Sequence, residues 1–469
     1  MEELLNRDQV VTNITSKHIV LLPSSGEEIV INKDNLNNIK DYKKVYKLVK
    51  HKLTKAANSE KDNVNNHIQK FGWIGYEPAS DSGHLRYYPK GSLIFSLIKD
   101  WQEELLLNTL KAAEIKTPIM YDWSKNDIKS QAGTFYERLY YVSTHNKDKD
   151  YVLRFGGDLG LFSMLKDMKI SYKNLPLRFY EFTNSFRNER RGELNGIKRA
   201  RSFSFFDIHS ICENLYSGWK EYSSFFKFQA DYSKQLGIEF AIEFTVEEKF
   251  YKEYKKEIQE LAIYIDSPIL IEIISSKKHY WAIKHVFYDD NNYKFFNSQL
   301  DFDNSDIYGI SHTSKEGQKH GCTICHHSLA SIERWICIFL ERAIKMEKPV
   351  MPIWLAPTQV RLIPLNNQMT QKTDEIFEIL NASNIRVDID DRFRKSIGSR
   401  IKMASEEWIP YTLVVGEKEL ETENYFFKCR HTDDKYMSIE QLINDVRKYT
   451  EKKPFRPIFN KFLSESPTI

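Results

Sequence analysis

Residue types that could bind a nucleotide are concentrated between Leu177 and Cys212, in two strand-like stretches that flank a basic loop. Alternate residues of a strand share one face, so Arg187 and Glu189 point the same way. One face of the second stretch carries a guanidinium, two aromatic rings, a carboxylate and an imidazole, from Arg201, Phe203, Phe205, Asp207 and His209. Because guanidinium groups fit phosphates and rings stack on purines, antiparallel pairing would create a nucleotide surface. A half-exposed sheet with incidental aromatics is the alternative.

A second candidate lies in the segment CTICHHSLASIERWICIFLERAIKM, which predicts a short strand followed by a helix. Apolar residues at i, i+3, i+4 spacing give that helix one core-facing side. Arg334 lies in its first turn, off the apolar side, although the amino end of a helix is already positive. A bound polyanion would explain this placement, and pairing with Glu333 or Glu341 is the alternative.

The cysteines indicate a reducing compartment, because five of them are scattered over 469 residues without a disulfide pattern. Cys322 and Cys325 form one C-x-x-C pair, which suits a metal but equally suits two buried strand residues. The net charge of +3, from 68 basic and 65 acidic residues, neither requires nor excludes nucleic acid. No apolar run approaches the ~20 residues of a membrane span, and the start, MEELLNRDQVV, lacks a signal peptide. We therefore expect a cytoplasmic protein with no membrane partner.

The elements that must position these residues predict an α+β domain. Helical spacing predicts a long helix over 92–113, followed by the strand IKTPIM, which is broken at Pro118. Further strand-like runs share apolar and β-branched residues, and they lie at 177–189, 201–212, 269–274, 279–286, 295–302 and 321–326. Six such runs with few long helices favour an antiparallel sheet flanked by helices.

Three domains are predicted from changes in the pattern of strands and helices along the chain. Residues 1–70 form a short appendage and linker with a helix between Lys40 and Lys55, although a solvated face of a larger domain is an equal alternative for this polar segment. Residues 71–355 form the antiparallel domain. Strands and helices alternate over 356–469, which predicts a separate α/β domain.

Several motifs, in order, resemble those of threonyl-tRNA synthetases of the archaeal type. The resemblance covers Tyr76 to Lys452 and includes YEPASDSGHLRYYPKG, LPLRFYEFTNSFRNERRGELNGIKRARSFSFFDIH, SIERW and DIDDRFRKSIGSRIKMASEEWIPYTLVVGEKE. It implies a class II catalytic sheet and a C-terminal anticodon-binding domain. It also implies an enzyme that uses ATP and Mg²⁺ to activate threonine and to load it onto tRNA(Thr). The helix at 92–113 and Pro118 would form the interface of a homodimer.

The resemblance also implies contacts with ATP. Arg187 would bind the α-phosphate and Arg334 the γ-phosphate. Glu189 would contact adenine, and Phe203 would stack beneath it. The remaining two contacts are Gln299, near the adenylate, and Arg199, in the loop 190–200 that would also meet the tRNA acceptor end.

The family binds zinc through one cysteine and two histidines, and the zinc holds the amino and hydroxyl groups of threonine. Here His209 matches one histidine, whereas Asp158 replaces the cysteine and Cys325 the second histidine. Aspartate, histidine and cysteine are all zinc ligands, so we expect a zinc site with changed ligands. In the alternative, a metal-free pocket, Asp158 and Asp207 would hold the substrate directly and specificity could leave threonine.

Two further residues bear on specificity. Phe205, which we place with Asp207 and Asp158 in the amino-acid pocket, and Val286 both replace residues that are polar in relatives. A paralogue with altered amino-acid or acceptor specificity, or a non-catalytic tRNA-binding regulator, is therefore the competing interpretation. The ~60 residues before the core are too few for the family's editing domain. We expect no cis-editing and some misacylation with serine, since one methyl group gives only ~1–3 kcal/mol of discrimination.

Overall fold

The computed structural model describes residues 15–32, 34–54, 63–144, 149–275, 281–303 and 305–465. The chain divides into two units. The first unit contains 1–59, 105–190 and 201–331, and the second contains 60–104, 191–200 and 332–469. No helix in the described part is long and apolar enough to cross a membrane. The segment MEELLNRDQVV lies outside the described part.

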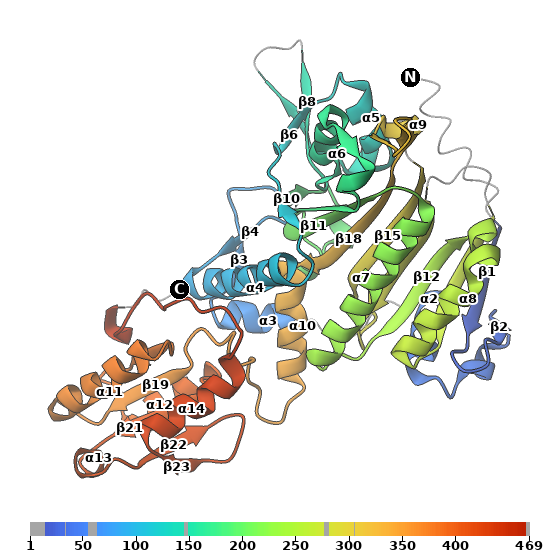
Figure 1. The fold of residues 1–469 in the computed structure, drawn as a ribbon. Coiled ribbons are helices and arrows are strands. Elements are labelled where there is room, and N and C mark those ends of the chain that lie inside the picture. Colours follow the sequence, from blue (N-terminus) through green and yellow to red (C-terminus); the bar gives the residue numbers. More distant parts are fainter. Residues whose placement is uncertain are drawn as a thin grey trace. The chain divides into compact units, whose positions relative to one another are not determined.

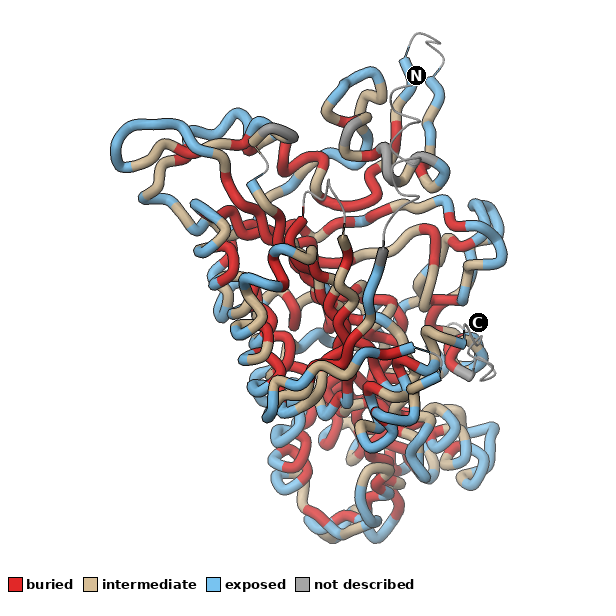
Figure 2. The backbone as a smooth tube through the Cα atoms, turned by 90° about the vertical axis from the view of Figure 1, so that its right-hand side faces the viewer, coloured by how far each residue is buried: buried red, intermediate tan, exposed pale blue. Residues whose placement is uncertain are grey.

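A ten-stranded sheet in the first unit carries the candidate residues (Figure 1). Its order is β2-β1-β13-β12-β14-β15-β18-β11-β10-β5. In that order the strands span Glu28–Val30, Thr15–Leu21, Ile269–Ser275, Ala241–Glu247, Trp281–Tyr288, Lys294–Asp303, Thr323–Ser331, Ser202–Cys212, Leu177–Phe186 and Ala113–Glu114. Neighbours pair antiparallel except β12 with β13 and β10 with β5, which confirms the predicted antiparallel sheet. Many residues of these strands are buried, and Figure 2 shows the buried segments gathered in the interior.

The two faces of this sheet have different neighbours. Helices α7 (Leu215–Gln235) and α8 (Glu248–Ile265) cross the front of the strands in Figure 1 and cover what we call the helix face. His285 and His327 point to this face, where they contact Tyr222 and Phe225 of α7. Neighbouring residues of a strand point to opposite faces. His326 therefore points to the other face, which we call the site face.

The amino-terminal segment adds strands at one edge of the sheet and a helix on its site face. Strand β1 pairs with β13 over seven residues, and α2 (Lys43–Thr54) follows, as predicted for the stretch between Lys40 and Lys55. The apolar side of α2, with Val45 and Leu48, packs against Leu270 of β13. Leu270 pairs with Glu243, and Glu243 pairs with Val286. The pairing continues strand by strand across the sheet to Asp207. Residues that pair across strands share a face. Helix α2 and the candidate site therefore occupy the same face.

The predicted long helix ends earlier than expected. Helix α4 runs Pro89–Asn108 rather than 92–113. Lys111 has a φ of 50°, a left-handed conformation that a helix cannot continue through. The chain then enters β5, which pairs with β10. Apolar periodicity continued past the end of α4 because only four residues separate this helix from β5.

Smaller elements complete the first unit. A three-stranded sheet is formed by β6 (Met120–Asp122), β8 (Asp150–Leu153) and β7 (Tyr141–Ser143). Helix α6 (Asp158–Asp167) follows it and faces the site. The remaining elements are α5 (Asn126–Ala132), β9 (Ile170–Ser171), α9 (Ser305–Tyr308), β16 (Ser311–Thr313) and β17 (Lys319–Gly321). The strand expected from residue 279 begins at Trp281, since 276–280 lie outside the description, and the one expected at 321–326 is β18, which continues to Ser331.

The second unit contains the predicted α/β domain. Its sheet has the order β20-β19-β21-β22-β23, parallel for the first three strands and antiparallel for the last two. The strands are Val387–Ile389, Val360–Pro364, Tyr411–Val415, Tyr425–Cys429 and Lys435–Met437, and the helices are α11 (Thr370–Ala382), α12 (Ile397–Glu406), α13 (Lys418–Glu421) and α14 (Ile439–Thr450). The unit also holds α3 (Asn63–Lys70), β3 (Ile74–Tyr76), β4 (Leu85–Tyr87) and α10 (Ile332–Ile344).

Candidate functional site

Three polar side chains converge on the site face of the large sheet. His209 lies on β11, His326 on the neighbouring strand β18, and Asp158 at the first residue of α6. Asp158 Oδ1 lies 2.8 Å from His209 Nε2 and 3.2 Å from His326 Nδ1. One carboxylate oxygen and two ring nitrogens thus lie within 4.8 Å of one another. We call these three residues the DHH cluster.

A buried carboxylate orients the second histidine of the DHH cluster. Asp301, on β15, is fully buried, and its Oδ2 lies 3.0 Å from His326 Nε2. Gln299 Nε2 donates to Asp301 Oδ1 at 2.5 Å. With Nε2 held by Asp301, His326 presents Nδ1 to Asp158. A carboxylate that fixes the outer nitrogen of a histidine is the usual support of a metal ligand.

The charges of the DHH cluster follow from burial and proximity. Burial alone lowers the pKa of His326, but the carboxylates Asp301 and Asp158 raise it to about 10. Burial alone raises the pKa of Asp158, but hydrogen bonds from both imidazoles hold it well below its usual range. The pKa of Asp207 is raised, mainly by burial. The carboxylate of Asp158 is therefore ionised and available as a ligand or as an anchor for a cation.

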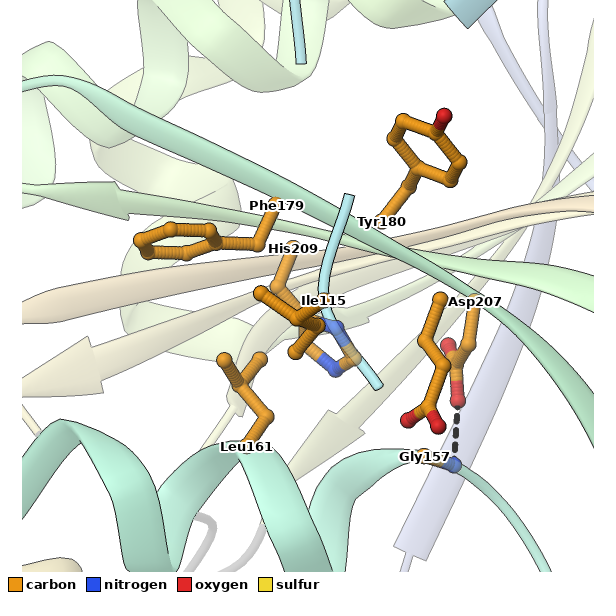
Figure 3. A pocket seen from close by; sticks show the side chains of 8 residues that line it. Ile115, Gly157, Leu161, Phe179, Tyr180, Asp207 and His209 are labelled. Atoms are coloured by element: carbon orange, nitrogen blue, oxygen red, sulfur yellow. Dashed lines mark hydrogen bonds between the residues drawn. The ribbon is translucent and has the colours of Figure 1, made fainter. Parts of the chain in front are cut away.

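Asp207 and His209 line one pocket beside the amino end of α6 (Figure 3). Gly157 N donates to Asp207 Oδ2 at 2.7 Å, and this bond fixes the carboxylate under the turn that leads into Asp158. A Cβ on Gly157 would lie 3.0 Å from the same carboxylate oxygen, so a side chain there would press on it. Strand alternation predicted that Asp207 and His209 share a face, and both line this pocket.

Arg187 and Phe203 lie together at the neighbouring end of strands β10 and β11. The Arg187 guanidinium lies 4.9 Å from the centre of the Phe203 ring and 5.2 Å from that of Phe135. Its Nε and Nη2 donate to the carbonyl oxygen of Phe155, at 3.3 and 3.2 Å. The Phe203 ring also stacks on Phe205, with 5.7 Å between ring centres. A guanidinium, which suits a phosphate, and an aromatic surface, which suits a base, are thus adjacent.

Glu189 is buried near this pair. Strand β10 ends at Phe186, but Arg187 N still donates to Arg201 O at 2.8 Å, so the strand pairing continues past that end. Arg201 donates through Nε and Nη2 to the backbone oxygen of Glu189, and Arg138 lies 3.4 Å from its carboxylate. The Glu189 side chain is therefore held in place, with its carboxylate beside a cation.

The remaining predicted ATP contacts belong to the second unit. Arg334 lies in the first turn of α10, as predicted, and the chain enters α10 directly from β18. Arg199 lies 3.5 Å from Glu193 within the loop 190–200. In the same loop, Lys198 pairs with Glu341 of α10 at 2.5 Å. The loop is therefore attached to the helix that carries Arg334.

Comparison with known proteins identifies the chain. The class II tRNA synthetase core domain (G, H, P, S and T) matches residues 140–343, and the anticodon binding domain matches residues 359–449. Over 97% of its length the chain is 35% identical to threonine–tRNA ligase of Pyrococcus furiosus, and it covers 74% of that protein. This chain belongs to the threonine–tRNA ligase family. A second relative, from Methanosphaera stadtmanae, is 37% identical over 81% of the chain, which covers 63% of that ligase.

Solved structures of lower sequence identity have the same fold. The RNA binding domain of threonyl-tRNA synthetase from Cryptosporidium parvum superposes with a TM-score of 0.71 at 20% identity, over 82% of this chain and 98% of that one. Prolyl-tRNA synthetase from the same organism gives 0.67 at 17% identity, over 84% and 78%. Both agree with the predicted α+β class II core followed by an anticodon-binding domain.

The structure places Cys325 away from the DHH cluster, which corrects its predicted position among the metal ligands. Its thiol donates to Gly218 O of α7 at 3.3 Å, on the helix face. His326, the next residue, faces Asp158 and His209 instead. Cys325 is therefore separated from the DHH cluster by the sheet. Burial also raises the pKa of its thiol well above the usual range, which disfavours the thiolate that a metal requires.

Val286, the second residue that replaces a polar one, has an apolar environment in the structure. It packs against the apolar cluster beneath α2, which is formed with Val20 and Leu270. On the same strand, Lys284 lies two residues before Val286, at the position paired with Gln299. Burial lowers the pKa of Lys284 to about 8, although Asp301 raises it. Sequence reasoning missed Lys284, whose charge interacts with that of Asp301.

A buried ion pair beneath the site was also missed. Arg154 Nη1 donates to Glu181 Oε1 at 2.7 Å, and both side chains are almost fully buried. Glu181 also accepts from Thr117 N and Oγ1 at 2.8 and 2.9 Å. Glu181 pairs with Asp207 across β10 and β11. The pair therefore fixes the chain before Pro118 to the strand next to the pocket.

Glu181→Gln is expected to lower the free energy of unfolding by about 3–5 kcal/mol, because it leaves Arg154 buried and uncompensated. The control is Glu137→Gln, whose partner Arg190 lies 2.7 Å away but whose pair is about three-quarters exposed. That change should cost less than about 1 kcal/mol. Urea unfolding measures the free energy of unfolding of both variants. Equal small losses would mean that burial does not increase the contribution of the Arg154–Glu181 pair to stability.

Proposed function

We propose that the protein is a threonine–tRNA ligase that activates threonine with ATP and transfers it to the 3′ end of tRNA(Thr). The observation that carries the proposal is the adjacency, on β10, β11 and β18, of a guanidinium–ring pair and the DHH cluster. One can hold a nucleotide and the other the amino acid that reacts with it. Family membership and the anticodon-binding domain support tRNA as the acceptor. Neither altered specificity nor a non-catalytic role is favoured by these comparisons.

In the proposed reaction, the threonine carboxylate attacks the α-phosphate of ATP and pyrophosphate leaves. Arg187 would hold the α-phosphate, Phe203 the adenine ring, and Glu189 the adenine edge. Arg334, Arg199 and Gln299 complete the proposed ATP contacts. The proposed cofactor is Mg²⁺, which offsets charge on the phosphates, so catalysis rests on positioning and electrostatics. The 3′-terminal ribose hydroxyl of tRNA then accepts the threonyl group.

We propose that the DHH cluster holds zinc. Asp158 Oδ1, His209 Nε2 and His326 Nδ1 fit this ion, because three protein ligands leave one position open for a substrate. When bound, zinc would supply a Lewis acid for the amino and hydroxyl groups of threonine. Two histidines and one carboxylate also suit Fe²⁺, so metal analysis has to cover both. Asp207, held by Gly157, is proposed to receive the substrate ammonium, with Phe205 on the same strand face.

Amino-acid-dependent ATP–pyrophosphate exchange tests the function. Each of the twenty amino acids is supplied in turn, and the expected result is exchange with threonine and weaker exchange with serine. Charging of tRNA(Thr) transcript should follow with threonine. Exchange with a different amino acid would replace the proposal by the altered-specificity alternative. No exchange with any amino acid would favour the non-catalytic tRNA-binding regulator.

We also propose a cytoplasmic homodimer. Large apolar side chains are exposed around α4 and the small sheet, at Leu107, Ile119, Met120 and Tyr141. A second copy that covers them would remove this apolar surface from water. The five cysteines are free, which suits a reducing compartment. Sedimentation should give twice the 55.5 kDa mass of the chain, and a monomer at micromolar concentration would refute the dimer.

A further inference from the structure

We propose that the exposed lysines of α2 bind the phosphate backbone of the tRNA acceptor arm. The inference rests on the proposed function, since it concerns the RNA whose 3′ end would enter the site. We call Lys43, Lys47 and Lys50 the lysine stripe. All three side chains are exposed, and Lys47 also donates to the backbone oxygen of Asp290. They follow i, i+4, i+7 spacing, so they form one row about 10 Å long on the helix surface.

The charge of α2 is unbalanced. Its twelve residues, KKVYKLVKHKLT, contain five lysines and no acidic residue. Helix α8 provides a comparison, because its lysines at 249, 252, 255 and 256 are interspersed with glutamates at 248, 253, 257 and 260. Lys252 of α8, for example, pairs with Glu248 at 2.7 Å. A helix that only needed solubility could use such balanced charges, whereas unbalanced lysines suit a polyanion.

Not every lysine of α2 belongs to this surface. Lys52 points inward and pairs with Glu243 of β12, which also accepts from Tyr288 Oη at 2.7 Å. Burial lowers the pKa of Lys52 to about 8. Lys44 lies 3.6 Å from Glu239. The inward pair and the apolar cluster beneath α2 fix the helix on the sheet, so the lysine stripe is held on a rigid support.

The location of α2 gives the stripe its partner. Helix α2 lies on the site face, over β12 and β13, and the DHH cluster lies on the same face over β11 and β18. Strand β12 is three places from β18 in the sheet, or roughly 15 Å at about 4.8 Å per strand. An RNA that delivers its 3′ end to the DHH cluster has its first duplex turns within this range. Phosphates of the acceptor arm therefore fit the stripe better than a distant part of tRNA does.

The test compares two triple variants of the full-length protein. The first is Lys43→Gln, Lys47→Gln, Lys50→Gln. The matched control is Lys249→Gln, Lys252→Gln, Lys256→Gln on α8, where the same number of exposed lysines lies on the helix face. Binding of tRNA(Thr) transcript and of a minihelix that contains only the acceptor and T arms is measured between 50 and 200 mM salt. Threonine-dependent ATP–pyrophosphate exchange and circular dichroism are recorded for every protein.

For the α2 variant we expect tRNA affinity to fall by about tenfold or more at 50 mM salt. The slope of log K against log salt should become shallower by about 2–3, since each lost phosphate contact removes roughly 0.9. The minihelix should lose affinity by the same factor, and exchange should stay at the wild-type level. The α8 variant should match the wild type in all measurements.

Three results would overturn the inference: unchanged affinity and slope, an equal loss in the α8 variant, or a loss with tRNA that the minihelix does not show. The last would locate the contact outside the acceptor arm. Failure of the proposed function would look different, because the wild type itself would then lack threonine-dependent exchange and charging. Exchange needs no tRNA, so it tests the proposed function independently of the stripe. A loss of tRNA affinity in the α2 variant therefore tests only the stripe.

Discussion

Replacing His326 with alanine is expected to abolish binding of the proposed metal and to lower threonine-dependent ATP–pyrophosphate exchange by at least about a hundredfold. The expectation rests on the place of His326 between Asp158 and Asp301, with Nδ1 directed into the DHH cluster and Nε2 held by the buried carboxylate. Loss of an outer partner such as Asp301 costs about 10–100-fold in metal affinity, and loss of a ligand costs more. Metal content by mass spectrometry and exchange kinetics measure the two effects.

The neighbouring cysteine provides the control. Cys325→Ser changes the adjacent residue, whose side chain lies on the opposite face against Gly218. That variant should keep both the metal and the exchange activity. Asp301→Asn should bind the metal about 10–100-fold more weakly. If Cys325→Ser loses the metal and His326→Ala keeps it, then the ligand predicted from sequence is right. If neither loses metal, the metal-free pocket with Asp158 and Asp207 becomes the better explanation.

The difference between Cys325 and His326 shows what sequence could not determine. The resemblance matched Cys325 to the second histidine of the family by position along the sequence, whereas the face that a residue occupies depends on strand register. Register along β18 is irregular on both sides, with shifts between Phe205 and Asp207 and between Leu300 and Asp303 of its neighbours. A shift of one residue exchanges the two faces. Adjacent histidine and cysteine residues could therefore be distinguished only by three-dimensional pairing.

Local patterns were sufficient for other parts. Alternation in β10 and β11 predicted both strands and the shared face of Asp207 and His209, because a half-buried strand repeats every two residues. Long-range partners were beyond such patterns. Nothing near β1 indicates that it pairs with β13, some 250 residues later, or that Arg154 pairs with Glu181 inside the core. The role of the amino-terminal segment and the buried support of the pocket therefore came from the structure.

Arg187→Ala is expected to reduce kcat/KM for ATP–pyrophosphate exchange by about 10²–10³, because one group directed at charge that develops in the transition state is worth ~2.7–4 kcal/mol. The structure gives this guanidinium a fixed position, between the rings of Phe135 and Phe203 and bonded to the carbonyl oxygen of Phe155. A side chain held in this way needs little reorganisation to meet the α-phosphate. Steady-state exchange at varied ATP concentration measures the loss.

Two comparisons separate a loss of chemistry from a loss of structure. Arg187→Ala should keep its metal, because the proposed ligands are Asp158, His209 and His326. Normal metal content with lost exchange would therefore identify a phosphate-binding role. Arg187→Lys keeps the charge but cannot reproduce the planar fork or its stacking on Phe203, so it should recover only a small part of the activity. Full activity in the lysine variant would show that charge alone is sufficient. Wild-type exchange in the alanine variant would remove Arg187 from the ATP site, and with it the argument that β10 and β11 bind a nucleotide.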